Sequence, residues 1–152
     1  MVSLNRGGSS ISSQRRILVT GGAGFIGSNF VHHWCSKYPQ DWVVVLDALT
    51  YAGNLSNLAN LKSRDNFKFV QGNICDRSLI DQLIRGESID TIAHFAAESH
   101  VDRSILDPDV FVRTNVLGTF TLLEAFKEHY QQIHEESKQK YRFLHVSTDE
   151  VF

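Results

Sequence analysis

Near its end, this 152-residue sequence places a hydroxyl beside two acids, in the order Thr148, Asp149 and Glu150. A hydroxyl can donate a hydrogen bond to a substrate oxygen, and two adjacent carboxylates can serve as an acid and a base. Carboxylates that lie close together raise one another's pKa, so that one of them can stay protonated near neutral pH. The alternative interpretation is a helix N-cap with an acidic first turn, which would be preferred if the segment stood alone.

A second chemical signal is the glycine-rich run TGGAGFIG at residues 20–27, directly after an apolar run at 17–19. Gly21 suits a turn with positive φ, Gly24 leaves room for a phosphate against the backbone, and Gly27 allows the following helix to pack closely. Free N–H groups at the start of that helix would attract an anion. The spacing therefore predicts a pyrophosphate site, with an ordinary structural turn as the alternative.

An acid in the right place supports a dinucleotide at this turn. Asp47 ends the apolar run 42–46 and lies 26 positions after Gly21. An acid at the end of the second strand accepts hydrogen bonds from a ribose, although it could also be a helix cap. A carboxylate there would repel a 2′-phosphate, and no Lys or Arg follows before Lys62. We therefore expect NAD to be preferred over NADP.

The elements that must position these residues alternate between apolar runs and amphipathic segments. This alternation predicts an α/β fold, a doubly wound (Rossmann) parallel sheet with strand order 3-2-1-4-5 that is truncated after strand 5. The ligand crevice is expected at the carboxyl ends of strands 1 and 4. The predicted strands cover 17–19, 42–46, 66–70, 91–95 and 141–146.

Two helices carry apolar residues at helical spacing. After Gly24, the spacing of Ile26, Phe30 and Trp34 predicts a buried face. A longer helix is expected to begin at Asp107-Pro108, where the acid is an N-cap and proline takes the first helical position. Its apolar face is formed by Val112, Val116, Phe120 and Leu123.

Composition predicts one soluble globular domain with a disordered tail at 1–14. Hydrophobic residues make up 42% and charged residues 21%, and the net charge of −2 comes without a basic block. We therefore expect no nucleic-acid or membrane partner. Cys35 and Cys75 are isolated, which favours free thiols in a reducing, cytoplasmic compartment. His94 is expected to be a hydrogen-bonded core histidine, and no metal site is predicted.

Four segments together carry a resemblance to a known family. They are ILVTGGAGFIGS at 17–28, DALTYAGN at 47–54, AAESHVDRSI at 96–105 and STDEV at 147–151. On these segments the chain resembles the extended short-chain dehydrogenase/reductase family, and within it the nucleotide-sugar 4,6-dehydratases that act on dTDP-glucose. The resemblance covers residues 15–152 and implies the N-terminal portion of an NAD-binding domain, with a C-terminal substrate domain absent.

The resemblance implies a lyase reaction in which NAD takes a hydride from C4 of dTDP-glucose and returns it to C6 after water is lost. The product would be dTDP-4-keto-6-deoxyglucose. Thr148 would hydrogen-bond the C4 oxygen, Asp149 would protonate the departing C6 hydroxyl, and Glu150 would remove the C5 proton.

The same resemblance implies two sets of binding residues. Those lining the cofactor would be Gly21, Gly24, Phe25, Ile26, Gly27, Asp47, Thr50, Asn73, Ile74, Ala96, Ala97 and Ser99. Those facing the substrate would be Ser99, His100, Val101, Asn115 and Thr148, although His100 is equally well read as an ordinary loop residue. Asn115 would also correspond to the family's structural asparagine near the active site.

Three departures from the family pattern limit these expectations. Asn73 stands where an aspartate usually contacts the adenine, and Phe152 replaces a tyrosine. The family's Tyr-x-x-x-Lys element does not occur in the 152 residues, so we expect no turnover by this chain alone. The alternatives are another nucleotide-sugar epimerase or decarboxylase, and a noncatalytic NAD-binding protein. The full-length form is expected to be a homodimer.

Overall fold

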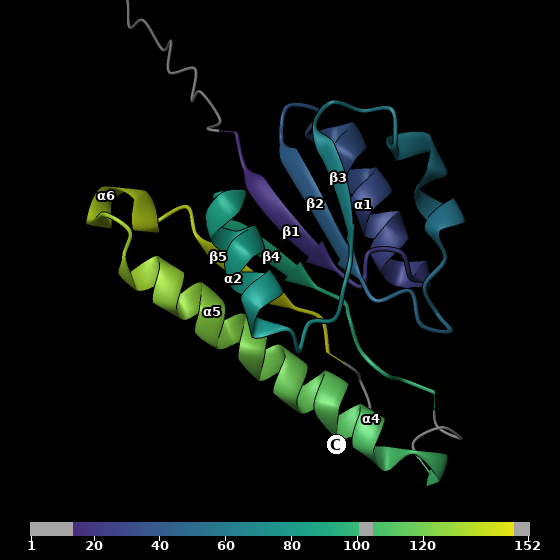
Figure 1. Ribbon diagram of the computed structural model, residues 1–152. Helices are drawn as coiled ribbons and strands as arrows, with labels where there is room; N and C mark the ends of the chain where they lie inside the picture. Colours follow the sequence, from purple (N-terminus) through teal and green to yellow (C-terminus); the bar gives the residue numbers. More distant parts are fainter. Residues whose placement is uncertain (1–13, 101–104, 148–152) are drawn as a thin grey trace, which may run out of the picture.

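Five parallel strands form the centre of the protein (Figure 1), and the computed structural model describes residues 14–100 and 105–147. The strand order β3-β2-β1-β4-β5 confirms the predicted topology. Each predicted strand is present, with its ends shifted by one or two residues at most. The bounds are β1 Arg16–Thr20, β2 Trp42–Asp47, β3 Phe67–Gln71, β4 Thr91–His94 and β5 Arg142–His145.

Helices cover both faces of the sheet, as the predicted doubly wound fold requires (Figure 1). Helix α1 (Phe25–Lys37) and the 3₁₀-helix η1 (Leu55–Leu61) pack on one face, where Ile17 and Val19 of β1 point. Helices α2 (Arg77–Gly86) and α5 (Thr119–Gln131) pack on the other face with Leu18. Because successive side chains of a strand point to opposite faces, the central strands bury apolar residues on both sides.

The buried face of α1 differs from the predicted one. The structure buries Gly27, Ser28, Val31 and Cys35, whereas Ile26 is 63% exposed. The prediction for Ile26 was therefore wrong. The reason is that Gly27 packs against the glycine turn, and this close approach turns Ile26 toward solvent at the end of the sheet.

The long helical segment begins at Pro108, as predicted, but it is not a uniform α-helix. Helix α4 (Pro108–Phe111) leads into a π-helix, η2 (Val112–Gly118), before α5. The predicted apolar face is present but lies in solvent. Its exposed members form a stripe that we call the apolar stripe: Val112, Val116, Phe120 and Leu123. A short helix, α6 (Glu135–Lys138), precedes β5.

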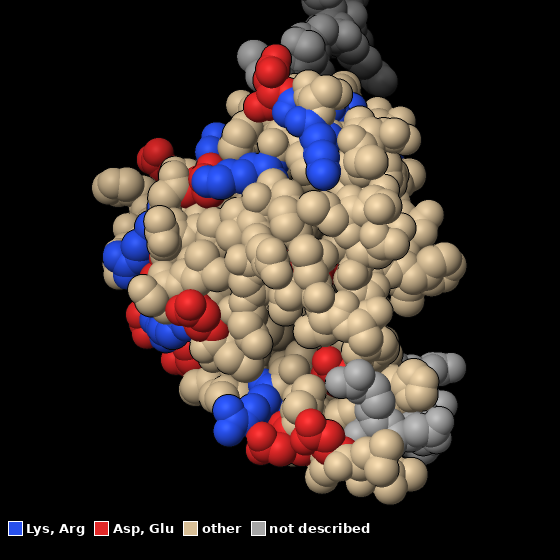
Figure 2. Space-filling view, turned by 45° about the vertical axis from the view of Figure 1, so that its right-hand side comes forward, with Lys and Arg blue, Asp and Glu red and all other residues tan. Residues whose placement is uncertain are grey.

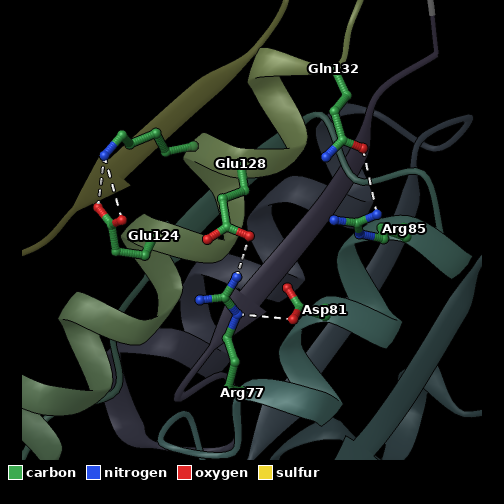
Figure 3. Close-up of polar contacts among 7 residues, drawn as sticks. Arg77, Asp81, Arg85, Glu124, Glu128 and Gln132 are labelled. Atoms are coloured by element: carbon green, nitrogen blue, oxygen red, sulfur yellow. Dashed lines mark hydrogen bonds and ion pairs between the residues drawn. The ribbon is translucent and has the colours of Figure 1, made fainter.

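Polar side chains join α2 to α5 outside the core (Figure 3). Arg77 of α2 donates to Asp81 on its own helix at 2.9 Å and to Glu128 of α5 at 2.6 Å. Two turns further along α2, Arg85 donates to Gln132, which follows the end of α5, at 3.5 Å. The two helices are thus held in register on the sheet by polar contacts as well as by apolar packing.

Cys35 is a buried free thiol, and Cys75 is a partly buried one. Within residues 14–100 and 105–147, no helix is long and apolar enough to cross a membrane.

Candidate functional site

The glycine turn between β1 and α1 packs against the end of β4. Gly21 has φ +68°, and a Cβ atom at this position would lie 2.6 Å from the backbone nitrogen of Ala96. A Cβ atom on Gly27 would collide with the carbonyl of Gly21. These two positions therefore require glycine, one for its backbone angle and close neighbour and the other for the tight start of α1.

The first turn of α1 has no side-chain cap. Its N-cap is Gly24, which offers no side-chain hydrogen bond, and no acidic residue occurs in the first turn. Phe25 is 82% exposed and Ile26 projects beside it. A helix of this length presents unpaired N–H groups and the positive end of its dipole at this position. The arrangement suits a phosphate group.

Asp47 lies next to this turn and contacts it directly. Its Oδ2 accepts a hydrogen bond from the backbone N–H of Ala23 at 2.9 Å, and its Oδ1 accepts one from Leu49 at 2.8 Å. Only 8% of the residue is exposed. Thr50 follows in the same loop and is exposed. The predicted ribose-binding acid is thus at the expected place, with both oxygens already hydrogen-bonded within the chain.

The loop after β4 is held by the π-helix. The Asn115 side chain accepts a hydrogen bond from Glu98 N–H and donates one to the Glu98 carbonyl, both at 2.8 Å. The amide of Asn115 is therefore engaged with the backbone at both of its polar atoms, which gives this residue a positioning role in the loop after β4. Ala97 and Ser99 are exposed on this loop, on either side of the buried Glu98.

The next residue of this loop, His100, is exposed and meets Tyr51 edge to face, with ring centroids 6.2 Å apart. Tyr51 belongs to the loop after β2. The contact therefore brings the loops of two neighbouring strands together beside the glycine turn.

His94 is a buried hydrogen-bonded histidine, as predicted. Its Nδ1 lies 2.7 Å from Thr20 Oγ1 and its Nε2 lies 2.9 Å from Thr119 Oγ1. Burial, together with the nearby His145, lowers its pKa to about 4. The ring is therefore neutral at physiological pH and connects β1, β4 and α5 just below the glycine turn.

A small cavity lies between the loop after β3 and the π-helix. Its volume is about 190 Å³, and it is lined by Asn73, Cys75, Val110, Arg113, Thr114 and Leu117. The side-chain oxygen of Asn73 accepts from Cys75 N–H at 2.9 Å. Sequence reasoning did not select Thr114, although it neighbours Asn115 on the same helix.

Ile74, predicted to line the cofactor, is only 5% exposed, and its side chain packs where a Cβ atom on Gly118 would fall, 2.5 Å away. Its side chain therefore belongs to the core, and only its main chain is left to line a cofactor.

The described chain before the predicted acid–base segment ends at the same edge of the sheet. Val146 N–H donates to the His94 carbonyl at 3.1 Å, so the chain leaves β5 beside the end of β4. Ser147 is the last described residue there. The predicted residues Val101, Thr148, Asp149 and Glu150 lie outside the described residues.

Charge on the surface shows no concentration of one sign on the face in Figure 2. The middle of that face carries almost no charged side chain, and Lys and Arg are interspersed with Asp and Glu at its top, left and bottom margins. In the described part of the chain, no group of three or more His, Cys, Asp or Glu side chains is placed to hold a metal ion.

Comparison with known proteins places this arrangement in a family. The model of the GDP-mannose 4,6 dehydratase family matches residues 18–152. A dTDP-glucose 4,6-dehydratase of Mycobacterium tuberculosis is 51% identical over 137 residues, which is 90% of this chain and 37% of the relative. The chain therefore spans little more than a third of the length of this curated relative.

Among solved structures, a dehydratase is more similar to this chain than an epimerase is. A dTDP-glucose 4,6-dehydratase from Streptomyces venezuelae, with NAD and TYD bound, is 53% identical with a TM-score of 0.70 and covers 74% of this chain and 36% of its own. A UDP-glucose 4-epimerase from Thermotoga maritima is 33% identical, with a TM-score of 0.65. The match covers 74% of this chain and 34% of the epimerase chain. This chain belongs to the GDP-mannose 4,6 dehydratase family and corresponds to the N-terminal part of its dTDP-glucose 4,6-dehydratase relatives.

Proposed function

We propose that this chain forms the NAD-binding part of a nucleotide-sugar dehydratase that acts on dTDP-glucose. The observation that carries the proposal is the uncapped start of α1 beside Asp47, at the carboxyl end of β1. Relatives about half identical to the chain are dehydratases, whereas the epimerase is only a third identical.

The described residues fit NAD. The N–H groups at the start of α1 would hold the pyrophosphate, and Asp47 would accept from the adenosine ribose. Asn73 would contact the adenine, and Ala96, Ala97 and Ser99 would line the nicotinamide side. When bound, NAD would supply a reversible hydride acceptor for C4 of the sugar.

The catalytic roles proposed for the segment after β5 divide the dehydration among three side chains. Thr148 would orient the C4 oxygen, Asp149 would give a proton to the departing C6 hydroxyl, and Glu150 would remove the proton at C5. Ser99, His100 and Val101 would contact the substrate from the loop after β4, which Asn115 holds in place.

Binding is tested on the 152-residue chain by titration calorimetry. We expect NAD to bind and NADP to bind more weakly, because Asp47 repels a 2′-phosphate. No 4-keto product should form from dTDP-glucose, because the chain has no Tyr-x-x-x-Lys element. If the chain does not bind NAD, the proposed function is wrong. Formation of a 4-keto product would contradict the expected inactivity of the chain alone.

The reaction is tested by joining residues 1–152 to the remaining part of the S. venezuelae relative. We expect this chimaera to form the 4-keto-6-deoxy sugar and Asp149→Asn to suppress the loss of water. In D₂O the wild-type chimaera should place deuterium at C5, and Glu150→Gln should not. An epimerised nucleotide sugar without dehydration would favour the epimerase alternative, and inactivity of a folded chimaera that binds NAD would favour a noncatalytic protein.

The partner proposed for the assembled protein is a second copy. The apolar stripe supports this, because its four members on successive helical turns lie in solvent. Exposed apolar surface of this kind favours an interface. Light scattering should show a dimer that Val116→Glu dissociates, and a wild-type monomer would contradict it. The free thiols of Cys35 and Cys75 support a cytoplasmic location.

A further inference from the structure

We propose that Asp47 is a positioning residue for the glycine turn as well as the residue that selects NAD, so that changing Asp47 alone cannot convert the site to NADP. This inference rests on the proposed function for the cofactor and extends it to how the site is built. At sites where the acid contacts only the ribose, its removal would simply make room for a 2′-phosphate.

The carboxylate of Asp47 is committed to the protein on both sides. Its Oδ2 accepts from Ala23 N–H in the glycine turn, and its Oδ1 accepts from Leu49 N–H in the loop after β2. A Cβ atom on Gly53 would lie 2.7 Å from Oδ1, so the loop also closes over the carboxylate. Hydrogen bonds to an ionised acceptor are stronger than those between neutral groups.

Ala23 is the point where the two loops are joined. It is fully buried, and its carbonyl accepts from Asn54 N–H at 3.0 Å and from the side chain of Asn57 at 2.9 Å. Together with the bond from its N–H to Asp47, these contacts attach both polar groups of Ala23 to the segment after β2. Ala23 immediately precedes Gly24, the N-cap of the helix that would hold the pyrophosphate.

Leu49 shows why the second bond is needed. Its φ of +53° is unusual for a residue with a branched side chain and is disfavoured sterically. The hydrogen bond to Asp47 Oδ1 holds this conformation, which directs the chain toward Thr50 and Tyr51. Loss of the carboxylate would therefore release both the glycine turn and the loop that encloses the ribose side.

Two substitutions separate positioning from selection. Asp47→Ala removes both hydrogen bonds and the charge, and Asp47→Asn can keep the bond from Ala23 while losing the charge and the acceptor for Leu49. For Asp47→Ala we expect the NAD dissociation constant to rise about tenfold or more, with no gain in NADP binding. For Asp47→Asn we expect a smaller rise in the NAD dissociation constant. The difference between the NAD and NADP dissociation constants should also be smaller than in the wild type.

A matched control is available at the other end of β2. Asp41 is also a buried acid, and it accepts from Arg15 N–H at 3.0 Å and from Trp34 Nε1 at 3.1 Å. Asp41→Asn should lower the thermal midpoint but leave the ratio of the NAD and NADP dissociation constants unchanged. Amide hydrogen exchange at Ala23 and Leu49 should accelerate in Asp47→Ala and not in Asp41→Asn.

The outcomes distinguish this inference from the proposed function. If the wild-type chain binds neither dinucleotide, the proposed cofactor is wrong, and amide exchange in Asp47→Ala still decides whether Asp47 positions the turn. Unchanged protection of Ala23 and Leu49 in that variant overturns the inference. It is equally overturned if Asp47→Ala binds NADP as tightly as the wild type binds NAD.

Discussion

The side-chain amide of Asn115 makes hydrogen bonds in both directions to the backbone of Glu98, each 2.8 Å long. This pair joins the π-helix η2 to the loop after β4, which carries Ala97, Ser99 and His100. Short π-helical segments frequently occur at functional sites. Here the π-helix places an amide opposite the N–H and carbonyl of one residue, so that the loop is held by contacts within the chain.

Replacing Asn115 by Asp should loosen this loop. The carboxylate can still accept from Glu98 N–H, but it cannot donate to the Glu98 carbonyl and would repel it. We expect the free energy of unfolding to fall by about 1–2 kcal/mol, measured by urea denaturation. Asn60→Asp, at an exposed position on η1, is the control and should change stability little. Equal effects of the two changes would contradict the proposed role of the pair.

His94 should make stability depend on pH below neutrality. Its pKa is about 4 in the folded chain and near 6.5 when unfolded, so protons favour the unfolded state between these values. The contribution of His94 to the free energy of unfolding is fully present above about pH 6.5. It is lost as the pH falls toward about 4, and the total loss is about 3 kcal/mol. Denaturation at a series of pH values should show this slope, His94→Gln should flatten it, and the exposed His33→Gln should leave it unchanged.

Gly27→Ala should disrupt the glycine turn, because the added methyl group would meet the Gly21 carbonyl. We expect a loss of about 2 kcal/mol or more in unfolding free energy, and weaker NAD binding. Gly86→Ala is the matched control, since nothing lies within 4 Å of its added Cβ atom at the end of α2. A Gly27→Ala protein as stable as the Gly86→Ala protein would show that the turn is looser than the structure indicates.

The polar contacts between α2 and α5 should contribute little to stability. Arg77 and Glu128 are 2.6 Å apart, but their side chains are 39% and 46% exposed. Glu128→Gln should therefore lower the unfolding free energy by less than about 1 kcal/mol, and added salt should reduce the difference further. Denaturant unfolding at low and high ionic strength measures both effects. A large loss that persists in salt would indicate a structural role beyond the ion pair.

Much of the fold could be predicted because its signals are local. The apolar runs ending at Val19, Leu46 and Phe95 read as buried strands, and alternation with helices leaves few topologies for a parallel sheet. Asp76 is a local signal of the same kind, since it caps α2 with its side chain accepting from Leu79 N–H. Such patterns depend on neighbours within a few residues, which is why sequence reasoning reached them.

Residue types and spacing were enough to predict the glycine turn, the acid at the end of β2 and the order of the strands, because they set turn angles, helix starts and apolar runs. The tertiary structure decided which partners these residues have. Asp47 accepts hydrogen bonds from Ala23 and Leu49, and Asn115 is hydrogen-bonded to Glu98. Ile26 faces solvent. These contacts form between segments that are distant along the chain, or they depend on how closely two backbones approach. Local periodicity in the sequence carries no information on either.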